Sequence, residues 1–539
     1  MGEALDQSVS RAKRLPLTWL AAAVLLAAYA GIRLLILPSD PLVARGFGHD
    51  AAYLVIVARN LLAGKGFVLD ALWLVWKNPP ALPMPYHNAG PLFPLLQAGL
   101  GRFFDTPLVL SGFVLSALAS AALMLAVSLL VRAYVASTAA AVGIGVLVAL
   151  FPPVWANSWE AITDQTWLAL FALFVVFLVR GRRPAMAVAA GLFLGLAWLT
   201  RSATVLAVPA VGLWLFLTFG LRRALWRGLL IALTAGAVTS PWLLHTARTW
   251  GSPLASDQSE LTAIHAYYAA QVGEMPERLW HSPNRPASFA SVAWEHPGTV
   301  LRRSFSGIPF ILREALRAAA DSSYLGAGVL LALGAVIGFR QRRLWRRPEA
   351  LACALYALTF MAAVAAGGRH IEDRYLLALF MLFAAWMLVS LYQVLLGVRA
   401  GQRDPIGLGT LALGALFLIG VVPRAGYGNA ARLRGDEPDK RAYADASVRL
   451  ARGMSGGTPV VVGSYPYYYS LVTGAQALSI PYADDAFLQS YMKKYHARFV
   501  FLTAAERRFW RPDWEKALPS FLEIRDTTGG FLVYGATTP

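Results

Sequence analysis

Residues 107–131 read PLVLSGFVLSALASAALMLAVSLLV, a run without a single charged side chain. A helix that crosses the hydrocarbon core of a bilayer needs about 20 mostly apolar residues. The same rule applied along the chain predicts eleven spans in total. They lie at 17–37, 107–131, 136–152, 163–180, 185–200, 203–220, 228–247, 324–339, 350–366, 375–397 and 406–423. We therefore expect a polytopic α-helical membrane protein.

The composition agrees with this fold class. Of the 539 residues, 57% are hydrophobic and 14% are charged, whereas about a quarter of the residues in a soluble protein are charged. A single cysteine, Cys353, excludes an intramolecular disulfide framework and CxxC-type metal sites. The sequence has no Walker A motif, no GxGxxG after a strand, no HExxH and no GxSxG elbow, so nothing supports a nucleotide-driven function.

The basic residues are distributed unevenly around the predicted spans. Short connections on one side hold 17 lysine and arginine residues, and those on the other side hold three. Because short cytoplasmic loops are enriched in lysine and arginine, the N-terminus is predicted to be cytoplasmic and the C-terminus extracytoplasmic. This topology explains most of the net charge of +18 without nucleic acid as a partner. The composition fits a bacterial plasma (inner) membrane.

Three outer pieces are too large to be connectors: 38–106, 248–323 and the tail 424–539. Within the first, 91–104 is too short and proline-broken to cross, so we expect a juxtamembrane or re-entrant helix. In the tail, expected helices at 436–453, 484–495 and 504–518 alternate with expected strands at 459–463, 498–502 and 531–534. The run 527–530 is a plausible hairpin turn. We therefore divide the chain into a transmembrane domain, 1–423, and an extracytoplasmic α/β domain, 424–539.

The first cluster of candidate functional residues follows the first span, in Gly46-Phe-Gly-His-Asp50-Ala-Ala-Tyr53. An ionisable residue in a membrane-facing loop is a functional candidate by default. Asp50 could equally be the N-cap of the helix that starts near Ala51. Further along this loop, Lys77, Tyr86 and His87 could hold an anionic head group at the membrane surface.

The second cluster opens the fourth span. Glu160 and Asp164 are four residues apart, so a helix would stack them on one face. Two such carboxylates repel unless one is protonated or a cation lies between them. A divalent cation is therefore possible, but this pair alone is weak support for one. Asp164 could instead be a carboxylate favoured by the helix dipole.

The third cluster is the polar loop Gly367-Gly-Arg-His-Ile-Glu-Asp-Arg-Tyr375 between two late spans. Arg369 and Arg374, together with Arg201 between spans five and six, could bind a phosphate, since guanidinium groups match phosphate oxygens. The alternative is that these arginines simply extend to the membrane surface.

These residues resemble a known family. An acidic residue a dozen positions past the first span, then AAYLVIVARNLLAGKGF and Gly90-Pro-Leu-Phe-Pro94, resembles the first outer loop of GT-C glycosyltransferases. The likeness is nearest to the bacterial protein O-mannosyltransferases and lipid A aminoarabinose transferases (family 39-like). It continues with Ile162-Thr-Asp164, Leu196-Ala-Trp-Leu-Thr-Arg201 and His370 to Tyr375, in the same order along most of the membrane region.

The resemblance implies an enzyme that moves a sugar, with inversion, from a polyprenyl- or dolichyl-phosphate donor to an acceptor at the outer face. Asp50 would be the general base, its pKa tuned by a desolvated site. Asp164 would orient a substrate. Arg374, His370 and Arg201 would stabilise the departing phosphate. The candidate site residues are Asp50, Asp164 and Glu160 as catalytic groups, and His49, Tyr53, Lys77, Tyr86, His87, Arg201, His370, Glu372, Arg374 and Tyr375 as substrate-binding groups, with no metal ligand.

The chain departs from this family at one point. Aminoarabinose transferases of this kind carry a lysine directly before Pro-Pro-Leu in the first loop, where this chain reads Tyr86-His-Asn-Ala-Gly-Pro-Leu92. The sugar and the acceptor (a protein, a glycolipid or a glycan) are therefore open. Aromatic residues of the outer pieces suit sugars or peptides but also serve as core or interface anchors: Trp280, Trp294, Tyr465, Tyr467, Tyr468 and Tyr469. We expect the run 466–469 to form a platform at a strand end, facing the membrane.

Two other functions stay open at this point. A transporter or flippase of lipid-linked saccharides would show repeat symmetry and charged or broken helices near the bilayer midplane. We see neither feature in the sequence. A ligase that transfers a whole glycan differs from the first reading mainly in the size of its donor, which the sequence does not distinguish.

Overall fold

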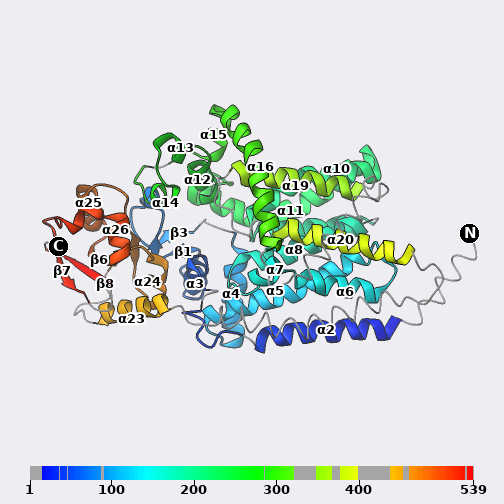
Figure 1. Ribbon diagram of the computed structural model, residues 1–539, viewed down its shortest axis with the longest axis horizontal. Helices are drawn as coiled ribbons and strands as arrows, with labels where there is room; N and C mark the ends of the chain where they lie inside the picture. Colours follow the sequence, from blue (N-terminus) through cyan, green and yellow to red (C-terminus); the bar gives the residue numbers. More distant parts are fainter. Residues whose placement is uncertain are drawn as a thin grey trace, which may run out of the picture.

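The computed structural model describes residues 15–35, 37–44, 47–86, 90–181, 183–284, 286–320, 348–366, 377–397, 438–452, 460–527 and 531–537. A long helical body occupies most of the molecule, and a β-sheet lies at one end of it (Figure 1). The helices of the body are α2 (Leu15–Leu35), α3 (His49–Leu62), α4 (Leu92–Phe104), α5 (Leu108–Val131), α6 (Thr138–Ala149), α7 (Pro152–Asn157), α8 (Thr163–Arg180), α9 (Pro184–Trp198), α10 (Val208–Phe219), α11 (Leu221–Trp250), α12 (Asp257–Ala263), α13 (Ala269–Val272), α14 (Pro276–Trp280), α15 (Phe289–Glu295), α16 (Pro297–Ala320), α19 (Pro348–Ala366) and α20 (Leu377–Gly397).

Five stretches of the described chain are helical, long and apolar enough to cross a membrane: Leu108–Val131, Thr163–Arg180, Ser202–Phe219, Leu221–Trp250 and Pro348–Ala366. Shorter apolar helices occupy the spans expected at 17–37, 136–152, 185–200 and 375–397. The spans expected at 324–339 and 406–423 lie outside the described residues, so the count of eleven stays a prediction. The segment 91–104 forms a helix, α4, as expected.

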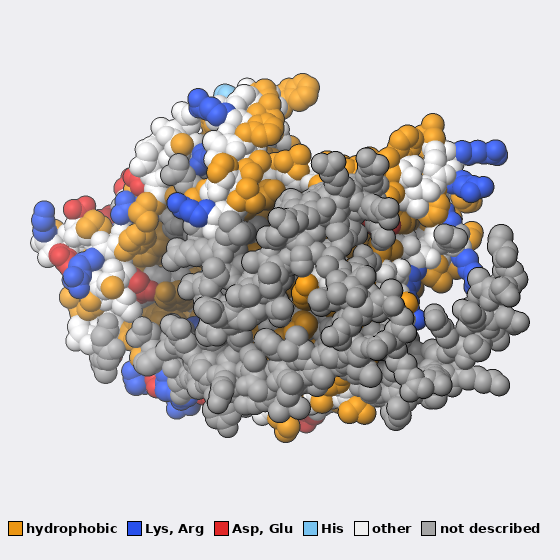
Figure 2. All heavy atoms as spheres, turned by 45° about the vertical axis from the view of Figure 1, so that its right-hand side comes forward, with side chains coloured by type: hydrophobic (Ala, Val, Ile, Leu, Met, Phe, Trp, Pro, Cys, Tyr) orange, Lys and Arg blue, Asp and Glu red, His pale blue; other side chains and the backbone are white. Residues whose placement is uncertain are grey.

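Small residues let the helices of the body approach each other closely. A Cβ added to Gly191 of α9 would lie 2.6 Å from the Ile231 carbonyl oxygen of α11, which leaves room only for glycine. Figure 2 shows hydrophobic side chains on the exposed surface of the described helices, with lysine and arginine side chains at both ends of the molecule. Leu221, Leu225 and Leu233 of α11 are among the exposed hydrophobic residues. Such a surface fits a bilayer rather than water.

The C-terminal part alternates helices and strands. Its helices are α23 (Pro438–Arg452), α24 (Pro466–Thr473), α25 (Asp485–Lys494) and α26 (Ala504–Trp510), and its strands are β4 (Val460–Gly463), β5 (Ala477–Ser479), β6 (Ala497–Thr503), β7 (Leu522–Asp526) and β8 (Phe531–Ala536). The strands expected at 459–463, 498–502 and 531–534 are present. The strands on either side of the expected turn at 527–530, β7 and β8, pair antiparallel, and residues 528–530 of that turn lie outside the described residues. The helix expected at 504–518 is shorter, because α26 ends at Trp510 and a 3₁₀ turn follows.

The sheet takes one strand from the first outer piece. Its strand order is β2-β5-β4-β6-β8-β7, and β2 (Ala71–Leu72) pairs parallel with β5 through Ala71–Ala477 and Leu72–Leu478. A separate two-stranded ribbon joins β1 (Val68–Leu69) to β3 (Met84–Pro85). One apolar core cluster contains residues of α3, β2, α24 and the C-terminal strands. The division of the chain at 423/424 stays a prediction, because 398–437 lies outside the described residues.

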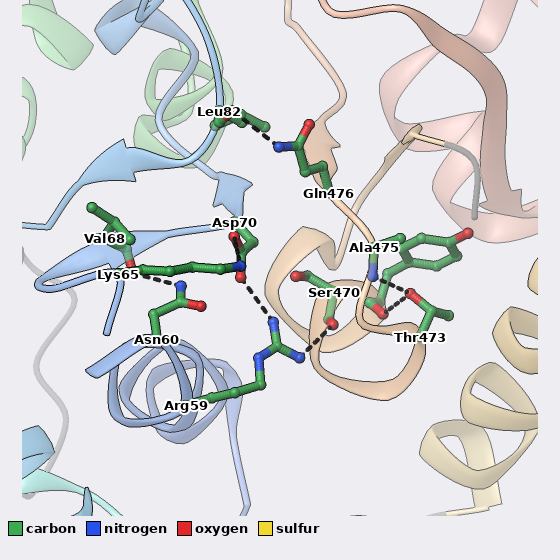
Figure 3. Close-up of polar contacts among 11 residues, drawn as sticks. Arg59, Asn60, Lys65, Val68, Asp70, Leu82, Ser470, Thr473, Ala475 and Gln476 are labelled. Atoms are coloured by element: carbon green, nitrogen blue, oxygen red, sulfur yellow. Dashed lines mark hydrogen bonds and ion pairs between the residues drawn. The ribbon is translucent and has the colours of Figure 1, made fainter. Parts of the chain in front are cut away.

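Polar contacts reinforce this junction (Figure 3). The Arg59 guanidinium of α3 pairs with the Asp70 carboxylate at 3.0 Å and donates to the Ser470 carbonyl oxygen of α24 at 3.2 Å. The Gln476 amide donates to the Leu82 carbonyl oxygen at 3.0 Å, and the Ala477 amide donates to the Asp70 carbonyl oxygen at 3.2 Å. The first outer piece and the C-terminal part are therefore one packed unit.

We predict that Arg59→Ala lowers the free energy of unfolding by about 2 kcal/mol, because it leaves the buried Asp70 carboxylate and the Ser470 carbonyl without this donor. Arg441→Ala is a matched control. Arg441 pairs with Asp40 at 2.8 Å across the same junction, but both side chains are exposed, so its loss costs under about 1 kcal/mol. Thermal melting of the detergent-solubilised protein measures both. Equal melting temperatures for the two variants would show that the Arg59 contact does not hold the junction.

Candidate functional site

Asp50 lies in the first turn of α3. The N-cap of this helix is Gly48, in an extended conformation and without a side-chain cap. The interpretation of Asp50 as the N-cap is therefore wrong, because the helix starts one residue before it, at His49, and Gly48 is the N-cap. At this position the carboxylate is only partly buried and lies at the N-terminal end of the helix.

His49, beside Asp50, packs among aromatic rings. Its ring centre is 5.1 Å from that of Trp73 and 4.6 Å from that of Tyr467. Burial lowers the pKa of His49 to about 4, although the negative charge of Asp50 opposes this shift. The imidazole is therefore neutral near pH 7. Its Nε2 has no hydrogen-bond partner in the described part of the chain.

Aromatic rings continue from this point across three pieces of the chain. Tyr53 of α3 lies 5.6 Å from Tyr467 and 6.0 Å from Tyr86, between ring centres. Tyr86 lies 6.3 Å from Trp242 of α11. The structure thus brings together the expected site residues His49, Asp50, Tyr53 and Tyr86. It adds Tyr467, which the sequence grouped with possible core or acceptor-binding aromatics.

Asp164 lies in the first turn of α8 and forms an ion pair with Arg201. The carboxylate side chain is 2% exposed and the arginine side chain 22% exposed. The guanidinium also lies 5.9 Å from the ring centre of Trp167. Because a guanidinium has five N–H donors, Arg201 can hold Asp164 and still offer donors to an anion.

Glu160 does not stack on Asp164. The helix begins at Thr163, so Glu160 lies in the preceding turn, where its backbone carbonyl accepts a 2.6 Å hydrogen bond from Ser116 of α5. The expected placement of both carboxylates on one helical face is wrong, because the chain between α7 and α8 turns at 158–162. Among the described residues, no three His, Cys, Asp or Glu side chains come together as a metal-ligand set.

The segment 90–92 joins the first outer piece to the end of α9. The Leu92 amide donates to the Leu199 carbonyl oxygen at 3.1 Å. A Cβ added to Gly90 would overlap that same carbonyl group, so only glycine permits this approach. This contact holds the segment 90–92 at Leu199, which is two residues before Arg201 in the sequence.

Arg33, which the sequence analysis did not select, fixes the turn that precedes Glu160. In the last turn of α2, its guanidinium is 3.5 Å from the ring centre of Trp159 and 4.8 Å from that of Trp155. It also donates to the Ser158 carbonyl oxygen. An arginine inside an apolar span was the signal that could have revealed this contact.

Lys77 is buried in a cluster of charges. Its ammonium lies 2.5 Å from Asp257 and 3.1 Å from Glu260, both on α12, and its side chain is 4% exposed. Trp76 donates to Glu260 at 3.2 Å. These contacts tie the first outer piece to the second. The positive charge of Lys77 is already matched by two carboxylates, which disfavours a contact with an anionic head group.

We predict that Lys77→Met lowers the free energy of unfolding by about 3–5 kcal/mol, because it leaves two buried carboxylates without their cation. Lys65→Met is the control: its ammonium is 3.9 Å from Asp70 and its side chain is 53% exposed, so we expect a loss under about 1 kcal/mol. Denaturant or thermal unfolding measures both variants. Recovery of stability on adding Glu260→Gln to Lys77→Met would confirm the cause, and a stable single variant would contradict it.

His281 is a second buried histidine that the sequence analysis did not select. Its Nδ1 is 2.6 Å from the Ser479 hydroxyl of β5, and its backbone carbonyl accepts from the Tyr482 amide at 2.7 Å. Burial, with a small contribution from His49, lowers the pKa of His281 to about 3. The residue links the second outer piece to the sheet.

Because the pKa of His281 is lowered in the folded protein, we predict that acid destabilises the protein. An unfolded histidine binds a proton below about pH 6.5, whereas the buried His281 does not until about pH 3. Stability is therefore lost as the pH falls from about 6.5 towards 3. Melting temperatures measured between pH 7.5 and 4.5 should fall less steeply for His281→Asn than for the wild type. The exposed His496→Asn should leave the slope unchanged; an equal change in both variants would contradict the assignment.

Six expected site residues lie outside the described residues: His87, Arg369, His370, Glu372, Arg374 and Tyr375. Their roles stay predictions.

No known family model matches the sequence, and no curated protein matches it. Solved structures match it along nearly its full length. ArnT from Cupriavidus metallidurans, bound to undecaprenyl phosphate, superposes with a TM-score of 0.58 at 14% identity, covering 96% of this chain and 98% of that one. The Archaeoglobus fulgidus oligosaccharyltransferase in complex with Zn and sulfate gives 0.55 at 14%, covering 95% and 73%. The same organism's AglB, with an inhibitory peptide and a dolichol-phosphate, gives 0.52 at 14%, covering 96% and 74%.

The chain therefore has the GT-C fold, as its resemblance predicted. At 14% identity these superpositions establish the fold alone.

Proposed function

We propose that this protein is an integral-membrane glycosyltransferase that takes a sugar from a polyprenyl-phosphate donor. It transfers the sugar, with inversion, to an acceptor hydroxyl or phosphate at the outer face of a plasma (inner) membrane. The observation that carries the proposal is the position of Asp50: a partly buried carboxylate at the start of α3, beside a neutral imidazole, in a chain with this fold. The neighbours support the donor class, since one is bound to undecaprenyl phosphate and another to a dolichol-phosphate.

In the proposed reaction, the Asp50 carboxylate takes the proton of the acceptor hydroxyl. The acceptor oxygen then attacks the anomeric carbon from the face opposite the lipid phosphate. The bond between the anomeric carbon and the phosphate oxygen breaks, and its electron pair leaves with the phosphate. A base placed within hydrogen-bond reach contributes about 10²–10⁴-fold to such a step.

The leaving phosphate needs positive charge that is already in place. Arg201 supplies it in this proposal, since Asp164 anchors the guanidinium in a buried pair while the side chain stays partly exposed. Asp164 is then a positioning group for Arg201 and not a second base. Arg374 and His370, outside the described residues, would assist. His49, Tyr53 and Tyr86 would contact the sugar or the acceptor from the aromatic wall beside Asp50.

A transferase of larger glycans is the second candidate, because two of the three superposed structures are oligosaccharyltransferases. It shares the donor chemistry and the base with the first candidate, and differs in how much sugar is moved.

We predict that Asp50→Asn lowers sugar transfer by at least about 10²-fold and leaves donor binding within a few-fold of the wild type, because the amide cannot accept the proton. The assay uses the purified protein in nanodiscs with a panel of radiolabelled polyprenyl-phosphate sugars and glycans. Asp105→Asn is the control: this carboxylate is exposed in the same outer piece, and asparagine tolerates its left-handed backbone.

Three results would count against the proposal. Wild-type turnover in Asp50→Asn would remove Asp50 from the mechanism. Equal losses in Asp50→Asn and Asp105→Asn would point to a general effect of lost charge. Movement of intact lipid-linked sugar across proteoliposomes without a covalent product would instead indicate a transporter.

A further inference from the structure

The start of α3 needs support from elsewhere in the molecule. Its N-cap, Gly48, makes no side-chain capping bond. Glycine is accepted at an N-cap but offers no side chain to the first-turn amides, at a cost of roughly a few tenths of a kcal/mol, so packing adds to the support of this turn. The orientation of Asp50 is therefore set by whatever packs against this turn.

The packing comes from α24, more than 400 residues later in the chain. Tyr467 contacts both His49 and Tyr53, at 4.6 Å and 5.6 Å between ring centres. Residues four apart lie on one face of a helix, so a single buried ring touches α3 at two points one turn apart. Two such points restrict both the rotation and the tilt of the first turns.

The neighbours of Tyr467 hold the chain before and after Asp50. The Tyr468 hydroxyl donates to the Leu42 carbonyl oxygen at 3.0 Å. The Ser470 carbonyl oxygen accepts from Arg59 at 3.2 Å. The helix α24 itself is short and well defined, with Pro466 in its first turn and Gly474 in a left-handed conformation after its end. The helix α24 thus contacts the chain at Leu42, before the candidate base, and at Arg59, after it.

Tyr467 also lies in the electrostatic field of the site. Burial raises the pKa of Tyr467 well above its usual value, and the negative charges of Asp257 and Asp50 add to this shift. The phenol is therefore neutral, and its ring lies against His49 in the first turn.

We infer that Tyr467, supplied by the C-terminal part, is a positioning residue for Asp50. This inference rests on the proposed function. On this inference, the C-terminal part contributes a side chain that packs at the active site. The ring does the positioning, so Tyr467→Phe should keep it and Tyr467→Ala should lose it.

The test compares Tyr467→Ala and Tyr467→Phe with Tyr491→Ala. Tyr491 is an equally buried tyrosine on α25, packed between Phe487 and Tyr495. Its loss controls for a general decrease in stability. Each full-length variant, in nanodiscs and below its melting temperature, is assayed for kcat and for the KM of the polyprenyl-phosphate sugar. Amide hydrogen exchange over residues 49–56 is measured in parallel.

We expect Tyr467→Ala to lower kcat by about 10- to 100-fold, because a misplacement of about 1 Å costs this much. The KM should change less than about threefold, and exchange at 49–56 should accelerate. Tyr467→Phe and Tyr491→Ala should stay near the wild type in kcat and in exchange at 49–56, even where Tyr491→Ala lowers the melting temperature.

Either of two results would overturn the inference: unchanged kcat and exchange in Tyr467→Ala, or the same losses in Tyr491→Ala. Faster exchange in Tyr467→Ala together with a wild-type protein that transfers no sugar would overturn the proposed function instead. In that case the role of Tyr467 in holding α3 would still be supported.

Discussion

The parallel pairing of β2 with β5 is the interaction on which the candidate site depends. It places two residues of the first outer piece at the edge of a sheet whose other strands all come from the C-terminal part. Once β2 is in place, α24 packs against α3, and Arg59 bridges Asp70 and Ser470. The short strand contributes few hydrogen bonds of its own, so the apolar cluster beneath it and the ion pair beside it are needed to hold the junction.

Several charged side chains are buried near the first outer piece. Lys77 faces two carboxylates, Asp164 faces Arg201, and Arg33 lies against two tryptophan rings. The charges of Lys77 and Asp164 are matched by opposite charges, as burial requires. Asp50 is only partly buried and lies in the first turn of α3.

Three pieces that are far apart in sequence meet at this carboxylate. The first outer piece carries Asp50, the second is tied to it through the charge cluster at Lys77, and the C-terminal part contributes Tyr467. His281 joins the second piece to the sheet. The GT-C fold provides the framework for this arrangement, and the function is proposed from the side chains that the framework brings together.

The sequence alone determined the features that depend on local composition. Apolar runs predicted the helices, short β-rich runs predicted three strands, and the run 527–530 predicted the final turn, because composition over a few neighbouring residues carries these signals. The short strands β2 and β5 carry no such signal, since two or three residues have no measurable period.

Only the tertiary structure decided which charged side chains form ion pairs and which aromatic ring packs against α3. It placed Glu160 in the turn before α8, outside the helix that carries Asp164, and it enclosed Lys77 between two carboxylates. It also made the run 466–469, expected as a platform, part of a buried helix. The partners of these residues lie roughly 40 to 420 positions away. Contacts over such separations depend on how the whole chain packs, and no local pattern encodes them.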